Sequence, residues 1–79
     1  MKIAIAGYGA EGKSSYAYWD SPENELVIVD EREISPTDVS LDANMMTGKG
    51  VFGKLEGFDM VVRSPGIAPN KIKTDGKVW

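Results

Sequence analysis

The sequence predicts a small α/β domain in three layers, built around a parallel sheet of four to five strands. Short apolar runs without polar residues recur along the chain and are typical of strands buried on both faces of a sheet. A glycine-rich loop follows the first run and precedes a segment that has the pattern of a helix. The length of 79 residues allows one domain, which we assign to residues 1–79.

The composition narrows the range of functions. The chain has no histidine and no cysteine, so it lacks the usual general base near neutral pH, disulfides and thiolate metal sites. A formal net charge of −3 argues against a general nucleic-acid binder. No apolar run approaches the roughly 20 residues that cross a bilayer. We therefore expect a cytoplasmic binding module rather than a complete enzyme.

The first half of the chain predicts a strand, a helix and a second strand. Ile3 to Ala6 is a continuous apolar run bounded by glycine, as in a strand of a parallel sheet. No proline interrupts the segment from Ala10 to Trp19, which we expect to be helical, and residues 20–24 have the composition of a turn. Leu26 to Val29 is rich in β-branched residues and predicts the second strand, which ends at Asp30.

The second half predicts shorter elements. Ser35 and Pro36 suit the start of a short helix. Met45 to Thr47 predicts a short strand, Val51 to Phe58 a brief helix, and Met60 to Val62 a further strand. Val78 and Trp79 resume the apolar pattern and could begin one more strand.

The loop after the first strand has the spacing G-x-G-x-x-G. Gly7 permits a tight turn, Gly9 lets backbone approach a phosphate, and Gly12 lets the helix pack closely on the strand. The start of the helix offers unpaired N–H groups to an anion. Asp30 follows 18 residues after Gly12, where an acid can accept hydrogen bonds from a ribose. This order is typical of a dinucleotide-binding unit, for example an NAD(P)-binding domain of an oxidoreductase or regulatory protein.

Two other interpretations of this loop remain open. Gly7, Gly12, Lys13 and Ser14 also satisfy G-x-x-x-x-G-K-[ST], the phosphate loop of nucleoside triphosphatases. A phosphoryl-transfer site requires more protein than 79 residues provide, which counts against that interpretation. The loop could also be a glycine-rich turn that binds nothing.

A second motif follows the strand at residues 60–62. Ser64, Pro65 and Gly66 form a turn at the carboxyl end of this strand, where ligands collect in parallel sheets. Together with the glycine loop and the Asp-x-Arg sequence at Asp30, this turn makes the chain resemble the N-terminal domain of the bacterial Mur ligases. Within that family the chain looks most like the members that add D-glutamate to UDP-N-acetylmuramoyl-L-alanine. The resemblance covers the whole chain in order.

The resemblance implies a Rossmann-like domain that binds the UDP part of the nucleotide-sugar substrate and holds neither a catalytic residue nor a metal ligand. In this sequence the matching UDP-binding positions are Gly7, Gly9, Ala10, Glu11, Gly12, Asp30, Glu31, Arg32, Ser64, Pro65 and Gly66. The glycines would shape the loop at the diphosphate, and the Asp-x-Arg segment would lie near the ribose and uracil. The Ser-Pro-Gly turn would form the facing wall. Glutamates stand at two of these positions, 11 and 31, where small or hydroxyl side chains are expected.

The resemblance also implies that the chemistry lies elsewhere in a larger enzyme. In this family a central domain binds ATP and Mg²⁺ and phosphorylates the substrate carboxylate, and a C-terminal domain helps to bind the incoming amino acid. Under this interpretation the 79 residues are a cytoplasmic domain fragment, and its partners are UDP-N-acetylmuramoyl-L-alanine and those two domains. We expect the fragment alone to be inactive in peptidoglycan biosynthesis.

Overall fold

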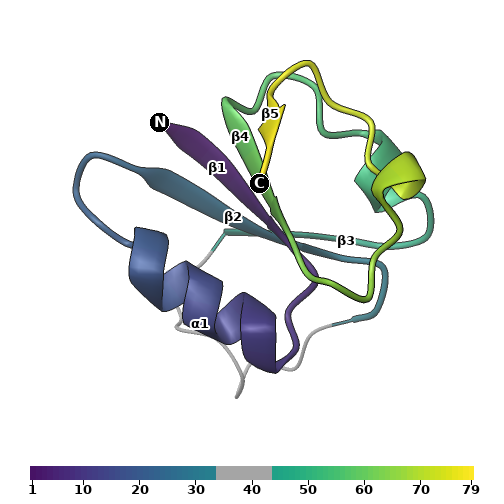
Figure 1. Ribbon diagram of the computed structural model, residues 1–79, viewed down its shortest axis with the longest axis horizontal. Coiled ribbons are helices and arrows are strands. Elements are labelled where there is room, and N and C mark those ends of the chain that lie inside the picture. Colours follow the sequence, from purple (N-terminus) through teal and green to yellow (C-terminus); the bar gives the residue numbers. More distant parts are fainter. Residues whose placement is uncertain (34–43) are drawn as a thin grey trace.

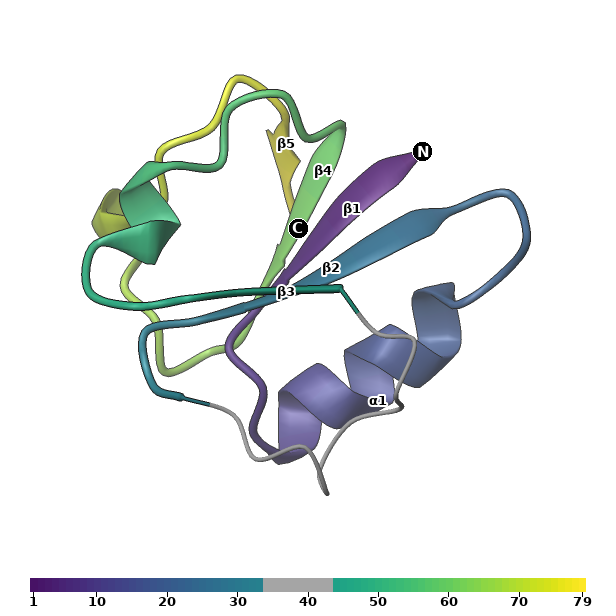
Figure 2. The ribbon, with the colours of Figure 1, turned by 180° about the vertical axis from the view of Figure 1, so that it is seen from behind.

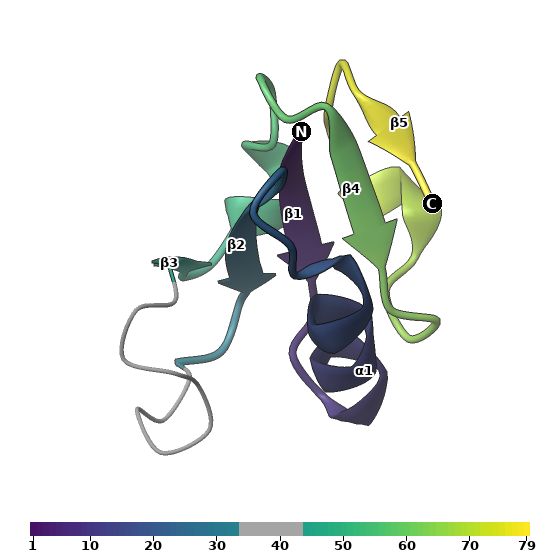
Figure 3. The same cartoon turned by 90° about the vertical axis from the view of Figure 1, so that its left-hand side faces the viewer.

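A computed structural model describes residues 1–33 and 44–79 of the chain. The elements in chain order are β1 (Lys2–Ala6), α1 (Ala10–Trp19), β2 (Glu25–Asp30), β3 (Asn44–Thr47), the 3-10 helix η2 (Val51–Gly53), β4 (Met60–Arg63), the 3-10 helix η3 (Pro69–Lys71) and β5 (Lys77–Val78). The five strands form one sheet in the order β3-β2-β1-β4-β5, and every pair is parallel (Figure 3). The predicted α/β class and strand number are confirmed.

The central strands are buried on both faces, which explains their continuous apolar sequences. Ile3 and Ile5 of β1 pack in a cluster with the partly buried Tyr16 and Trp19 of α1. The alternate residues of β1 point to the opposite face and join a second cluster. This division follows from the two-residue period of a strand.

The second face of the sheet is covered without an α-helix in the described residues. Val51, Phe52, Leu55 and Phe58 pack there, and part of the segment 67–72 lies against them. Figures 1 and 2 show α1 on one side of the sheet and the two 3-10 helices on the other. Within residues 1–33 and 44–79, the third layer is therefore made of loops and short helical turns.

The strand order reverses beside β1. The chain proceeds outward from β1 to β2 and β3, and then returns to place β4 on the opposite side of β1. In open parallel sheets such a reversal leaves a crevice at the carboxyl ends of the strands, where ligands bind. The topology therefore predicts a ligand site at the edge of the sheet where the loops after β1 and β4 meet.

The prediction of a helix from Val51 to Phe58 is wrong beyond its first turn. Gly57 adopts a φ of +88°, which a right-handed helix does not accommodate. The backbone of this segment instead forms hydrogen bonds with Lys73. The N–H of Leu55 donates to the carbonyl of Lys73 at 3.1 Å, and the N–H of Lys73 donates to the carbonyl of Phe52 at 2.9 Å. The predicted helix start at Ser35 and Pro36 lies outside the described residues. The last strand begins one residue earlier than expected.

Candidate functional site

The carboxyl ends of β1, β2 and β4 lie side by side at one edge of the sheet. The register pairs Ala6 at the end of β1 with the residues immediately before Asp30 in β2 and Ser64 after β4. The loops that follow these three strands therefore begin at the same level along the sheet. The N–H of Gly7 extends the β1–β2 pairing by donating to Val29 at 2.7 Å. Three of the predicted motifs thus converge although they are far apart in the sequence.

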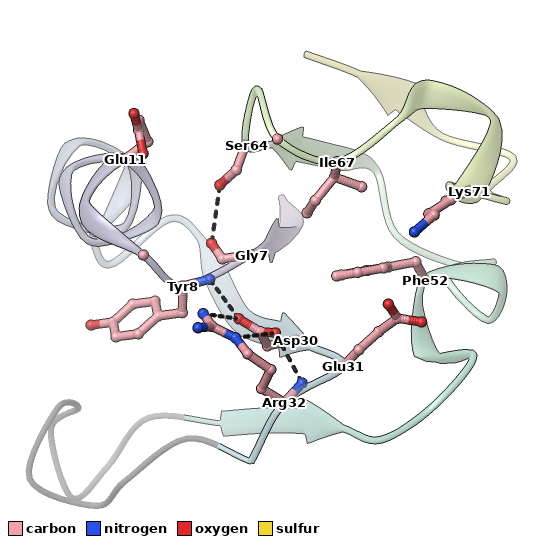
Figure 4. Close-up of a pocket in the computed structure, with 12 residues that line it drawn as sticks. Gly7, Tyr8, Glu11, Asp30, Glu31, Arg32, Phe52, Ser64, Ile67 and Lys71 are labelled. Atoms are coloured by element: carbon pink, nitrogen blue, oxygen red, sulfur yellow. Dashed lines mark hydrogen bonds and ion pairs between the residues drawn. The ribbon is translucent and has the colours of Figure 1, made fainter.

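A cavity of about 350 Å³ opens at this edge (Figure 4). It is lined by Gly7, Tyr8, Gly9, Glu11, Asp30, Glu31, Arg32, Phe52, Ser64, Gly66, Ile67 and Lys71. Its volume is at the lower end of the range for small-molecule sites, about 300–1,000 Å³. The cavity therefore has room for a small molecule or for part of a larger one.

The three glycines of the loop have different structural roles. Gly7 has a φ of +87°, and a β-carbon there would lie 2.9 Å from the Ser64 hydroxyl oxygen and from the Ile67 Cδ1 atom. A β-carbon at Gly12 would overlap the carbonyl oxygen of Gly7. Among the described residues, and apart from the chain neighbours of Gly9, no atom lies within 4 Å of the β-carbon position at Gly9. Packing requires glycine at the first and third positions, whereas the second leaves open space at the cavity.

The amino end of α1 points its free N–H groups toward the loop. Gly9 is the N-cap and supplies no side-chain cap. The first intrahelical bond runs from the N–H of Lys13 to the carbonyl of Gly9 at 3.0 Å. The preceding N–H groups of residues 10–12 have no carbonyl acceptor within the helix. These donors, with the positive end of the helix dipole, favour an anion beside Gly9.

Asp30 is a buried carboxylate with several donors. Its Oδ2 accepts a 2.9 Å bond from the N–H of Tyr8, and its Oδ1 accepts a 3.0 Å bond from the N–H of Arg32. Burial by itself raises the pKa of Asp30, but hydrogen bonds from the backbone of Arg32 and Tyr8 and from the Arg32 guanidinium outweigh burial and lower that pKa below its ordinary value. Asp30 is therefore ionised at neutral pH.

The side chain of Arg32 folds back over Asp30. Its Nη2 lies 3.3 Å from Oδ2, and its Nε lies 3.5 Å from Oδ1 of the carboxylate. The Arg32 side chain is 75 % exposed, whereas that of Asp30 is 7 % exposed. Between them in sequence, Glu31 accepts a 3.3 Å bond from the N–H of Gly50. The acid is thus internally paired and the arginine is the more accessible of the two.

The turn after β4 is held in place by its own hydrogen bonds. The Ser64 hydroxyl donates to the carbonyl of Gly7 at 3.3 Å and so links the two loops. The N–H of Ile67 donates to the carbonyl of Ser64 at 3.0 Å. Nη1 of Arg63 donates to the carbonyl of Ile67 at 2.7 Å. This network gives the cavity a fixed wall opposite α1.

Most of the predicted site residues line this cavity, and three do not. Those that line it are Gly7, Gly9, Glu11, Asp30, Glu31, Arg32, Ser64 and Gly66. Ala10 begins α1 beside it, and Gly12 is buried beneath the loop. Pro65 instead lines a neighbouring cavity of about 480 Å³ between α1 and the β4–β5 side of the sheet.

Four lining residues are absent from the predicted set. Tyr8 stands between two glycines of the loop, and Ile67 directly follows the Ser-Pro-Gly turn, so proximity to a motif could have identified both. Phe52 comes from η2 and Lys71 from η3. Neither belongs to a sequence motif, and only the folding of their segments over the sheet brings them to the cavity.

The geometry disfavours the triphosphatase interpretation of the loop. In that motif the lysine and serine open the helix that follows the phosphate loop. Here α1 already begins at Ala10, so Lys13 lies one turn into the helix. The Nζ atom of Lys13 is 5.9 Å from the centre of the Tyr8 ring, and Ser14 lines the neighbouring cavity instead.

No protein-family model, no curated protein and no solved structure matches this chain. In the part of the chain that the structure describes, no helix has the length and apolar character needed to cross a membrane. The functional argument therefore rests on the geometry of the cavity.

Proposed function

We propose that this domain binds the UDP moiety of UDP-N-acetylmuramoyl-L-alanine and serves as the N-terminal, non-catalytic domain of a cytoplasmic ATP-dependent D-glutamate-adding ligase. The observation that carries the proposal is the convergence of the glycine loop, the Asp30–Arg32 segment and the Ser-Pro-Gly turn around one cavity of about 350 Å³. ATP and Mg²⁺ would act in a central domain that these residues do not include.

The diphosphate fits best at the start of α1. The N–H groups of residues 10–12 are available there, and Gly9 presents no side chain to an approaching phosphate. Donors of this kind at a helix start bind phosphate oxygens without any basic side chain.

The nucleoside fits the rest of the cavity. Phe52 and Ile67 supply an apolar surface, and Figure 4 shows both on the side of the cavity away from α1. Arg32 lies at the rim with most of its side chain exposed, so its guanidinium can reach a ribose or base oxygen. A small number of polar groups around an apolar surface is the usual composition of a ligand site.

The hydrogen bonds of Asp30 count against the ribose contact that an NAD-type site uses, and they count equally against a direct contact of Asp30 with the ribose of UDP. A dinucleotide site of the NAD type uses this acid to accept hydrogen bonds from a ribose. Here both carboxylate oxygens already accept bonds, from the Tyr8 N–H and from the backbone and side chain of Arg32. Asp30 is better suited to holding the loop and the arginine than to direct contact with a ribose.

A titration of the ¹⁵N-labelled chain with UDP tests the proposal. We expect fast-exchange shifts of the amides of Gly9, Asp30 and Gly66, with a dissociation constant on the order of 1 mM, because one shallow cavity supplies all the contacts. The matched pair of variants is Gly9→Ala and Gly53→Ala, since neither new methyl group comes within 4 Å of a described residue other than its chain neighbours. Only the first should weaken binding.

Two results would contradict the proposal. One is the absence of shifts at these amides at several millimolar UDP. The other is tighter binding of NAD than of UDP in direct competition, which would favour an oxidoreductase-type or regulatory dinucleotide domain.

A further inference from the structure

We propose that the neighbouring cavity of about 480 Å³ is a second ligand site, and that its ligand is a small aromatic carboxylate. This cavity lies between α1 and the β4–β5 side of the sheet, and its lining combines three aromatic rings with an arginine. Its volume falls within the usual range of small-molecule sites, about 300–1,000 Å³. The second site goes beyond the proposed nucleotide function and does not depend on it.

Aromatic side chains are unusually exposed at this cavity. Tyr18 is 79 % exposed and Trp79 is 65 % exposed, and these are the two most exposed large apolar side chains among the described residues. Both tryptophans of the chain line the cavity. Apolar side chains that gather at one exposed place are typical of an interaction site.

The three rings form one cluster centred on Trp19. The ring centroids of Tyr18 and Trp19 are 5.1 Å apart with their planes at 77°, and those of Trp19 and Trp79 are 5.9 Å apart with their planes at 80°. The backbone around the cluster is fixed, because the carbonyl of Trp19 accepts a 2.9 Å bond from Nδ2 of Asn24 and the N–H of Trp79 donates to Val61 at 2.8 Å. Stacked and edge-to-face contacts are both favourable for a flat aromatic ring, and nearly perpendicular rings can provide both.

Arg63 places a positive charge beside these rings. Its backbone N–H donates to the main-chain oxygen of Trp79 at 3.3 Å, and its Nη1 donates to the carbonyl of Ile67 at 2.7 Å. Within residues 1–33 and 44–79, Nη1 is the one guanidinium nitrogen of Arg63 with an acceptor. Nε and Nη2 therefore remain as a pair of donors on a guanidinium that is already held in place. Two parallel donors of this kind match the two oxygens of a carboxylate.

The charges of the lining favour recognition by direct contact over long-range attraction. Glu11 is the other charged residue of this cavity, so the lining has one cationic and one anionic side chain. No ion pair joins Glu11 to Arg63 in the described part of the chain. An aliphatic acid would leave the rings unused, and an uncharged aromatic molecule would leave the two guanidinium donors unused. The ligand that uses both features has one carboxylate and one aromatic ring.

A titration of the ¹⁵N-labelled chain with phenylacetate, phenylacetamide and acetate tests the proposal. We expect phenylacetate to shift the indole N–H signals of Trp19 and Trp79, with a dissociation constant on the order of a few millimolar. Phenylacetamide keeps the ring but not the charge and should bind about three- to tenfold more weakly. Acetate keeps the charge but not the ring and should leave both indole signals in place.

Two variants separate the contributions of the arginine and the rings. Arg63→Gln should lower the affinity for phenylacetate to about that for phenylacetamide. Tyr18→Ala should weaken both probes by the same factor, and it should retain the fold because the Tyr18 side chain is largely exposed. Lys54→Gln is the matched control, since it removes one positive charge from an exposed residue at the end of η2, on the other face of the sheet (Figure 1). This control should change neither affinity.

Three results would overturn the proposal. Equal affinities for phenylacetate and phenylacetamide would show that the cavity does not select a carboxylate and is an apolar docking surface. Unmoved indole signals at several times the expected dissociation constant would show that it binds no such ligand. Equal effects of Arg63→Gln and Lys54→Gln would exclude the guanidinium from the site. No measurement here uses UDP, so failure of the second site leaves the proposed nucleotide function standing, and the reverse also holds.

Discussion

The Asp30 carboxylate accepts a 2.9 Å hydrogen bond from the backbone N–H of Tyr8, and this bond ties the end of β2 to the glycine loop after β1. The same carboxylate accepts from the N–H of Arg32. An acid at the end of β2 therefore holds two loop segments in position before any ligand arrives. Loss of this carboxylate should therefore lower the stability of the fold.

Asp30→Asn should destabilise the fold by about 1–3 kcal/mol at pH 7, because an amide cannot serve donors on both of its atoms. The folded-state pKa of Asp30 is lowered, so its contribution is present above the unfolded-state pKa of about 3.9 and is lost as the pH falls through the folded-state value. The difference in urea midpoint between wild type and variant should therefore shrink below about pH 4. A difference that stays constant from pH 7 to pH 3 would contradict this role.

Arg32→Ala should lower the free energy of unfolding by less than Asp30→Asn does, and by less than about 1 kcal/mol. The reason is that the guanidinium is largely exposed and its ion pair is screened by water. The backbone N–H groups of Tyr8 and of residue 32 still hold the carboxylate in this variant. Urea unfolding of both variants at pH 7 gives the comparison. Equal losses of stability would show that the guanidinium, and not the backbone, anchors Asp30.

Gly12→Ala should destabilise the domain by about 1–3 kcal/mol, since its methyl group would displace the Gly7 carbonyl and separate α1 from β1. Gly53→Ala is the control, because in the described part of the chain its new methyl group contacts nothing within 4 Å beyond its chain neighbours. Thermal or urea unfolding of the two variants measures the difference. The prediction fails if both variants unfold at the same midpoint.

Gly9→Ala should leave the unfolding midpoint near that of the wild type, because the added carbon comes within 4 Å of no described residue other than its chain neighbours. The methyl group occupies space that a bound phosphate would need, so UDP binding should weaken about tenfold, as for the loss of one hydrogen bond to a charged group. Amide shift titrations give the affinity. A stable variant with unchanged affinity would exclude this position from the phosphate site.

The strands and α1 could be predicted because their signals are local. Ile3 to Ala6 and Leu26 to Val29 are uninterrupted apolar runs, and burial on both faces requires that pattern. The segment after Gly50 could not be predicted in the same way. Its backbone bonds with Lys73, a residue distant in sequence, and no local pattern encodes such pairing.

The site was predictable where a backbone requirement produces a motif. Gly7 and Gly12 are needed for a positive φ and a close helix approach, and these needs appear as a spacing in the sequence. Phe52 carries no such requirement and reaches the cavity as part of the core. The position of Asp30 in the sequence indicates an acid at a strand end, but its hydrogen-bond partners depend on the conformation of the neighbouring loop.

The link between Ser64 and Gly7 joins residues 57 positions apart in the chain. The cavity therefore does not exist until β4 has docked beside β1, which is a non-local step of the kind that slows folding. Ligand affinity for the folded state alone adds directly to the free energy of unfolding. A nucleotide bound between the loops after β1 and β4 would therefore stabilise the contact that forms late in folding. The unfolding temperature of the entire sheet would rise in proportion to the logarithm of the nucleotide concentration.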